Sequence, residues 1–425
     1  MVDEIKSNSR LTSSSFGRCL RGWYYCRVMR LFTLLQNIAL AIAKTFGRRL
    51  RQPHNGEGYR ILLTGSFDSS NWILSYLRPL AASKACSHIT MVSSSPVPAF
   101  PKVDAVYPPK WLVRVIGATP ARLLIFFSTA VRKHPNIVGG YSILANGLVA
   151  SVVAPIVGAR SLYHCVGGPA EVLDGGVYAE DGPFTKIEIP DLVVERRLLR
   201  AVAACDIVLT MGTKAVDFFQ SRGVNTDFHV ISASIDIEQF APADSPPCYD
   251  LIFVGRLVEI KCIDILLKAV QHVRNTIPNV TAVIVGEGPL RGELEQLVRE
   301  LGISDCVAFV GRQHNIREWL NKARLFVLTS RSEGLSIAMT EAMACGLPAV
   351  VSDVGDLADL VEDGINGFLV PRLTPELFAD RIIELLTNNE KLRDFSQAAR
   401  RSALRYDIKA MAQRWDNIIA SCRES

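Results

Sequence analysis

The sequence predicts an α/β protein built from two doubly wound, mainly parallel sheets. Short apolar runs alternate with helical patterns through residues 59–240, and the same alternation restarts at residue 250. A Pro-rich break at residues 241–247 separates the two series, as expected for an interdomain linker. With 425 residues, the chain is long enough to form two hydrophobic cores.

We therefore expect three parts: a basic N-terminal extension (1–58), a first domain (59–242) and a second domain (243–425). The last helix, at about 406–425, is expected to pack back on the first domain. Of the net charge of +5, residues 1–58 alone contribute +7, so the two domains together are close to neutral. A nucleic-acid partner is therefore not expected, because such partners require a basic surface on the folded domain.

The N-terminal extension combines apolar, aromatic and basic residues between positions 16 and 51. Its longest uncharged run, Leu31–Ala43, has 13 residues, whereas a membrane span needs about 20. Aromatic residues interleaved with arginines favour a helix lying on an anionic membrane surface. A helix packed on the body of the protein fits equally well. The expected location is the cytoplasm, with peripheral contact to the cytoplasmic face of the membrane as the alternative.

Apolar runs predict the strands of both domains. In the first domain they are Arg60–Thr64, His88–Val92, Val103–Tyr107, Leu123–Phe127, Asn136–Gly139, Ser161–Val166, Asp206–Thr210 and Phe228–Ser232. In the second domain they are Asp250–Val254, Val280–Val285, Val307–Val310, Arg324–Leu328, Pro348–Ser352 and Gly367–Val370.

Helical periodicity fills the intervals between these strands. The predicted helices are Ser142–Val157, Pro190–Ala204, Ile263–Asn275, Leu290–Leu301, Ile316–Asn321, Leu335–Cys345, Leu357–Val361, Pro375–Leu386, Asn389–Ala403 and Ile408–Ser421. The ten cysteines are scattered without a C-x-x-C spacing, which favours reduced thiols over a disulfide framework or a metal site.

Charged and small residues cluster in loops that follow the strands of the second domain. Arg256 and Lys261 follow the first strand, and such a pair can hold a diphosphate through charge-assisted hydrogen bonds. Glu333 lies in a glycine-containing loop, and Glu341 follows it two turns into a helix. Taken singly, each of these features is equally typical of a solvated surface or an ordinary turn.

Five segments in this order resemble the nucleotide-sugar-binding half of retaining glycosyltransferases of family 4. These enzymes have the GT-B fold, in which two Rossmann-like domains face each other. The segments are FVGRLVEIKCIDILLKA (253–269), GEGPLRGELEQL (286–297), FVGR (309–312), SEGLSIAMTEAMACGLPAVVSDVGD (332–356) and DGINGFLV (363–370).

The resemblance implies roles for the residues that match its motifs. Arg256 and Lys261 would hold the donor diphosphate, Glu341 would accept hydrogen bonds from the ribose, and Glu333 would lie near the transferred sugar. The remaining expected donor-site residues are Glu287, Arg312, Gly334, Leu335, Ser336, Gly65 and Ser66. Helical spacing predicts that Met339 and Met343 point away from Glu341, into the core.

In the first domain, His164 ends a strand at a position where the family carries a histidine near the reacting sugar. We expect His164 to position substrate or to act in catalysis; a packed structural histidine is the alternative. Asp356 departs from the family, which has a small residue at this position.

The function implied is metal-independent transfer of a sugar from a nucleoside diphosphate to a glycan or lipid-linked acceptor. Synthesis of a polysaccharide, lipopolysaccharide or glycolipid is the expected setting. No cofactor is expected, and no Asp-x-Asp pair is present. The alternatives are a nucleotide-sugar epimerase, a sugar-phosphate synthase and a non-catalytic sugar-nucleotide-binding protein. The sequence leaves the sugar, base, acceptor and oligomeric state open.

Overall fold

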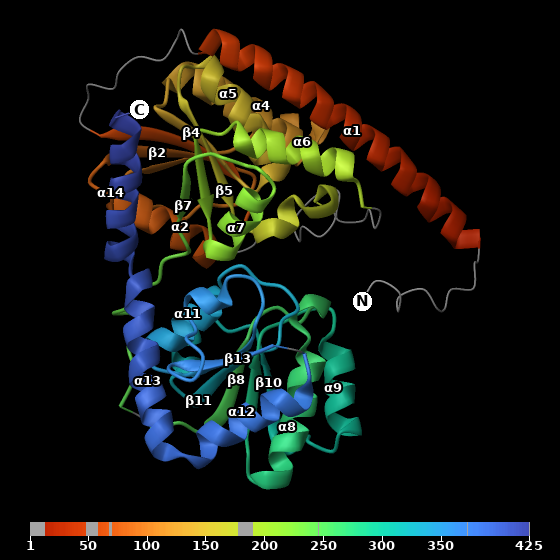
Figure 1. Cartoon of the computed structure of the whole chain (residues 1–425), viewed down its shortest axis with the longest axis vertical. Helices are drawn as coiled ribbons and strands as arrows, with labels where there is room; N and C mark the ends of the chain where they lie inside the picture. Colours follow the sequence, from red (N-terminus) through yellow and green to blue (C-terminus); the bar gives the residue numbers. More distant parts are fainter. Residues whose placement is uncertain are drawn as a thin grey trace.

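A computed structural model describes residues 13–47, 58–67, 70–176, 190–244, 246–371 and 373–424. Within these ranges the chain forms two parallel sheets with helices packed against them, one above the other in Figure 1. The predicted α/β class with two parallel-sheet domains is confirmed. Residues 1–12 and 48–57 of the predicted N-terminal extension lie outside the described residues.

The first sheet has the strand order β3-β2-β1-β4-β5-β6-β7, and all of its pairs are parallel. Its strands are β1 (Tyr59–Gly65), β2 (Cys86–Ser93), β3 (Val103–Val106), β4 (Ile137–Tyr141), β5 (Arg160–Cys165), β6 (Ile207–Thr210) and β7 (Phe228–Val230). The order reverses between β1 and β4, and open α/β sheets bind ligands at the carboxyl ends of the strands at such a switch point.

The second sheet has the order β10-β9-β8-β11-β12-β13 and is also parallel throughout. Its strands are β8 (Tyr249–Val254), β9 (Ala282–Val285), β10 (Val307–Gly311), β11 (Ala323–Leu328), β12 (Ala349–Ser352) and β13 (Gly367–Val370). Here the order reverses between β8 and β11. The loops that follow these two strands carry Lys261 and Glu333, so the topology brings the two residues to one switch point.

Helices connect these parallel strands. They are α2 (Ser70–Ala82), α3 (Lys110–Ile116), α4 (Ala118–Lys133), α5 (Leu148–Ile156), α6 (Leu192–Ala203), α7 (Thr213–Ser221), α8 (Ile263–Thr276), α9 (Arg291–Glu300), α10 (Ile316–Leu320), α11 (Ile337–Ala344), α12 (Pro375–Thr387) and α13 (Asn389–Ala403).

Two of the predicted elements are wrong. Leu123–Phe127, predicted as a strand, lies within α4, where Phe126 is buried and Leu124 and Phe127 are exposed. A five-residue apolar run is too short for its period to distinguish a strand from one face of a helix. Leu357–Val361 forms only a 3₁₀ turn, Leu357–Asp359.

The two ends of the chain both contact the first domain. The C-terminal helix α14 (Ile408–Glu424) packs against α2, and Asp416 accepts hydrogen bonds from Ser83 Oγ (2.6 Å) and the Ala85 N–H (2.9 Å). The N-terminal helix α1 (Ser13–Gly47) lies along the outside of α5 and α6 (Figure 1).

The length of the apolar segment in α1 differs from the prediction. By length and composition, its stretch Cys26–Thr45 is long enough to cross a membrane, with a mean hydropathy of 1.4 over 20 residues. The count from Leu31 to Ala43 stopped at the flanking charged residues and therefore underestimated this stretch. In this structure the helix packs on the first domain, the second of the two arrangements left open by the sequence.

Candidate functional site

The loops at the carboxyl ends of β8, β9 and β10 lie in close backbone contact. A Cβ added to Gly286, which has φ +149°, would stand 1.8 Å from the Gly255 carbonyl oxygen. The Leu257 N–H donates to the Glu287 carbonyl (2.9 Å), and the Gly286 N–H donates to the Gly311 carbonyl (2.9 Å). Glycine is required at residue 286 because any side chain would push the first two loops apart.

Lys261 and Glu333 form an ion pair between the loops that follow β8 and β11. Lys261 Nζ lies 2.6 Å from Glu333 Oε1, and the two side chains are only 16% and 9% exposed. The same carboxylate oxygen accepts a hydrogen bond from Ser330 Oγ (2.5 Å). The Arg331 N–H donates to the Ile260 carbonyl (2.8 Å), which fixes the register of the two loops. A residue predicted to hold diphosphate thus directly contacts the one predicted to lie near the sugar.

The other basic residues of the predicted donor site are more open. Arg256 is exposed on the loop after β8, and Arg312 is exposed after β10. Glu287 is exposed and pairs with Arg291 at the start of α9. These residues line the same edge of the second sheet as Lys261, because parallel strands end on one side.

Helix α11 begins directly after the Glu333 loop. The Ser336 side chain caps it by accepting a hydrogen bond from the Met339 N–H (3.3 Å). Met339 and Met343 are fully buried, which confirms the predicted helical faces. Leu335 is buried, whereas Gly334 and Ser336 are half-buried.

Glu341 is half-buried on the other face of α11. Desolvation raises the pKa of this carboxyl from its ordinary value of 4.5 to about 8. Among the described residues, no hydrogen-bond donor contacts the carboxylate. A carboxylate with this lack of donors is suited to accept hydrogen bonds from hydroxyl groups of a ligand.

The predicted residues of the first domain are less accessible. His164 is 2% exposed, and its Nε2 lies 3.2 Å from the Ile231 carbonyl oxygen. Its ring packs against Tyr76 and Tyr141, with centroid distances of 4.9 and 5.2 Å. Burial lowers the pKa of His164 to about 4, so the imidazole is neutral at neutral pH. Of the loop after β1, Gly65 is buried and Ser66 is exposed.

A direct contact joins the two domains beside the Glu333 loop. Asp359 accepts hydrogen bonds from the Thr213 N–H (2.7 Å) and Thr213 Oγ1 (2.6 Å), at the start of α7. Asp356 accepts one from the Lys214 N–H (3.0 Å), and Lys214 Nζ pairs with Asp353 (3.0 Å). Carboxylates at a helix N-terminus bind its unpaired N–H groups and complement its dipole.

Asp356 and its neighbours thus connect the two domains, a role that the sequence did not reveal. Asp356 is 1% exposed, and burial, followed by the charge of Asp359, raises its pKa to about 6. A Cβ added to Gly355, at φ +52°, would stand 1.7 Å from the Glu333 carbonyl oxygen. The interdomain contact and the Glu333 loop therefore touch through backbone atoms.

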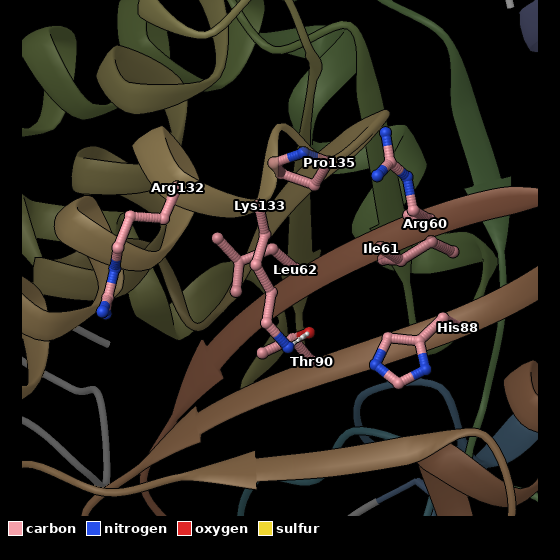
Figure 2. Close-up of a pocket in the computed structure, with 8 residues that line it drawn as sticks. All are labelled: Arg60, Ile61, Leu62, His88, Thr90, Arg132, Lys133 and Pro135. Carbon is pink, nitrogen blue, oxygen red and sulfur yellow. Dashed lines mark hydrogen bonds between the residues drawn. The ribbon is translucent and has the colours of Figure 1, made fainter.

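A separate pocket lies away from this region. Figure 2 shows its lining: Arg60, Ile61, Leu62, His88, Thr90, Arg132, Lys133 and Pro135. Lys133 Nζ points at Thr90 and donates to its hydroxyl (3.1 Å), while Asp104 pairs with His88 (3.0 Å). Because Arg60 and His88 lie near the amino ends of β1 and β2, this pocket opens on the edge opposite the carboxyl ends.

Metal ligands do not gather in the described ranges. Within residues 13–47, 58–67, 70–176, 190–244, 246–371 and 373–424, no group of three His, Cys, Asp or Glu side chains is placed to hold an ion. The nine cysteines whose side chains are described are free thiols.

Comparison with known proteins places the second domain in a family. Residues 237–402 match the model for glycosyl transferases group 1. D-inositol 3-phosphate glycosyltransferase of Frankia alni is 35% identical over 179 residues, which are 37% of this chain and 44% of that protein. N-acetyl-alpha-D-glucosaminyl L-malate synthase of Bacillus anthracis is 31% identical over 152 residues, which are 36% of this chain and 40% of that protein. The matched part is thus less than half the length of these relatives.

Solved structures match over both domains. Anabaena HepE in complex with UDP-glucose superposes with a TM-score of 0.66 at 20% identity, covering 85% of this chain and all of that one. Sucrose-phosphate synthase of Thermosynechococcus elongatus gives a TM-score of 0.69 at 18% identity, covering 86% and 99%. At these identities the likeness establishes the GT-B fold alone. The chain therefore belongs to the group 1 glycosyltransferases by its second domain and has the two-domain GT-B fold.

Proposed function

We propose that this chain is a retaining glycosyltransferase that moves a sugar from a nucleoside-diphosphate sugar to an acceptor hydroxyl. The main support is the Lys261–Glu333 pair at the β8/β11 switch point of a group 1 glycosyltransferase domain. A cation for diphosphate and a carboxylate for sugar meet there, with the donor-poor Glu341 on the adjoining helix. The setting we propose is synthesis of a polysaccharide, lipopolysaccharide or glycolipid.

Each donor-site residue has a defined task in this proposal. Arg256 and Lys261 bind the diphosphate and stabilise the negative charge that develops as it departs, so transfer proceeds without a metal ion. Glu341 accepts hydrogen bonds from the ribose. Leu335 and Ser336 offer backbone N–H groups at the start of α11, where the helix dipole favours an anion.

Glu333 acts on the sugar side of the pocket. Its ion pair with Lys261 sets the position of both side chains before the diphosphate arrives. When a diphosphate engages Lys261, the carboxylate becomes free to accept hydrogen bonds from sugar hydroxyls. The bond between the anomeric carbon and the diphosphate oxygen breaks, and the acceptor oxygen forms a new bond on the same face and loses its proton.

The first domain supplies the acceptor side. His164 is assigned a positioning role: it is buried against Tyr76 and Tyr141 behind the carboxyl edge of the sheet. A Cβ added to Gly334 would be 3.4 Å from the Val166 carbonyl oxygen, so the donor loop meets the strand that carries His164. Ser66 is exposed at the β1/β4 switch point and completes this side.

We further propose that the protein works in the cytoplasm, in peripheral contact with the anionic face of a membrane through residues 16–51. A lipid-linked acceptor would then be presented at the surface that the first domain contacts. The alternative activity is a sugar-phosphate synthase, favoured by the superposition on a sucrose-phosphate synthase. The product decides between them, because a synthase glycosylates a free sugar phosphate.

The experiment is a product assay with the purified chain and a panel of nucleotide sugars, analysed by mass spectrometry. UDP-glucose is tested first, because the superposed HepE structure contains it. We expect Lys261→Ala to lower turnover by about 10²–10³-fold, the usual cost of removing one group that stabilises developing charge. Lys268→Ala, on α8, is the matched control. Transfer by Lys261→Ala at the unchanged rate would refute the diphosphate assignment.

A further inference from the structure

Helix α1 is turned inside out relative to a helix that faces water. Its inward face is polar: Thr33 is fully buried and Gln36 is 8% exposed. Gln36 Nε2 donates to Ser151 Oγ (3.2 Å) on α5, and Asn37 Nδ2 donates to the Arg197 carbonyl (3.4 Å) on α6. A water-facing helix has the opposite arrangement, with its apolar stripe turned to the core.

The outward face of α1 is apolar. Leu31, Leu35 and Ile42 are 57%, 56% and 55% exposed. The other exposed apolar residues of this helix are Val28, Phe32, Leu34 and Ile38. A contiguous exposed apolar surface of this kind marks a binding surface for another molecule or a membrane.

Two further helices extend this surface. α3 packs against α4, α4 packs against α5, and α5 lies beneath α1 (Figure 1). On α3, Trp111 and Val115 are 65% and 74% exposed. On α4, the exposed apolar residues are Leu124, Phe127 and Val131. We call the outward residues of α1, α3 and α4 the apolar face.

The charges around the apolar face are all of one sign. Neither α1 (residues 13–47) nor the whole stretch 105–170 contains an aspartate or glutamate. Exposed basic residues stand among the apolar ones: Arg27, Arg30, Lys110, Arg114, Arg132 and Lys133. Apolar side chains mixed with arginine and lysine, without acidic residues, complement the surface of an anionic bilayer.

A bilayer fits this face better than a second copy of the chain. Symmetric pairing would bring two basic surfaces together, at a cost in like-charge repulsion. A spanning orientation of α1 also conflicts with its contacts. Arg30 Nε pairs with Asp191 (2.7 Å) at the start of α6, and Arg197 donates to the Arg30 carbonyl. Leaving the domain to cross a membrane would break these bonds and strip Gln36 of its partners.

We propose that α1, α3 and α4 together form a monotopic membrane-docking face, with α1 in the plane of the bilayer interface and Trp111 at its headgroup level. This extends the membrane contact proposed for residues 16–51 to a second, distant part of the chain. It also fixes α1 as lying on the membrane instead of crossing it. Docking needs no sugar transfer, so the two proposals can fail separately.

The test is co-sedimentation of the full chain with vesicles of phosphatidylcholine alone or mixed with phosphatidylglycerol, without nucleotide sugar. We expect binding to the anionic vesicles that weakens as salt rises. Leu35→Glu and Val115→Glu should each weaken it by about tenfold or more. Ile365→Glu, at a 56% exposed site in the second domain, is the matched control and should bind as the original does.

A second measurement does not depend on how the glutamate variants fold. Brominated lipids quench tryptophans that enter the interface, and we expect this quenching to fall in Trp111→Phe. Binding lost in Leu35→Glu but unchanged in Val115→Glu, with no quenching of Trp111, would overturn the extended face. A dimer that Leu35→Glu dissociates, without lipid binding, would assign the face to a second copy. Resistance of α1 to alkaline extraction would replace the in-plane orientation with a spanning one.

Discussion

Replacing Glu341 by glutamine should change how the stability of this protein depends on pH. The folded carboxyl has a pKa of about 8, against an ordinary value of 4.5. The folded state therefore holds this proton more tightly than the unfolded chain does. The free energy of unfolding falls as pH rises from 4.5 to 8, because the unfolded chain ionises first.

The shift corresponds to about 3 kcal/mol of lost stability at pH 7 and about 5 kcal/mol above pH 9, at 1.36 kcal/mol per pKa unit. Since the side chain is only half-buried, solvent screening lowers the expected effect to about 2 kcal/mol at pH 7. Glutamine keeps the shape without the charge. We expect Glu341→Gln to gain about 2 kcal/mol over the original chain between pH 5 and pH 9.

Urea unfolding at pH 5, 7 and 9 measures this difference, and Glu293→Gln on the exposed face of α9 is the control. Parallel pH curves for the original chain and Glu341→Gln would refute the desolvation argument. A ribose that donates hydrogen bonds to the carboxylate should also expel its proton. Calorimetry of UDP binding at pH 7, in buffers of different ionisation enthalpy, should show proton release that Glu341→Gln abolishes.

Three further changes test the contacts around the site. Glu333→Gln removes the partner of Lys261, so UDP should bind more tightly by titration calorimetry while sugar transfer slows; weaker UDP binding would argue against the proposed exchange of partners. Asp359→Ala removes two hydrogen bonds from the start of α7, so small-angle scattering should show a larger radius of gyration; an unchanged radius would mean that this contact does not hold the domains together. Gly286→Ala should lower the unfolding midpoint and UDP affinity because its Cβ would overlap the Gly255 carbonyl, whereas Gly292→Ala, in open space on α9, should not; equal midpoints would contradict the close loop approach.

Local pattern was sufficient for much of the second domain. Its strands are buried apolar runs bounded by glycine or charge, and its helices carry a clear period, so elements and order follow from the chain itself. The facing of Met339 and Met343 away from Glu341 follows from helical geometry alone. The five motifs in order led to the glycosyltransferase family, and the family model matches residues 237–402.

Pattern failed where a segment had two comparable environments. The run at residues 123–127 has the composition of a strand, but tertiary packing makes it one turn of α4 with Phe126 inside. Helix α1 misled for a related reason: its apolar side faces outward and its polar side is buried on α5 and α6. No local period states which side of an amphipathic helix meets the protein.

The sequence by itself determined the two-domain α/β plan and the types of residue at the strand ends, because both depend on short-range patterns. Only the tertiary structure decided which of these residues meet. The Lys261–Glu333 pair spans 72 residues, and the contact between Asp359 and Thr213 spans 146. Burial likewise decided the charge states: it raised the pKa of Glu341 and lowered that of His164, because desolvation depends on the surrounding atoms, which lie far apart along the chain.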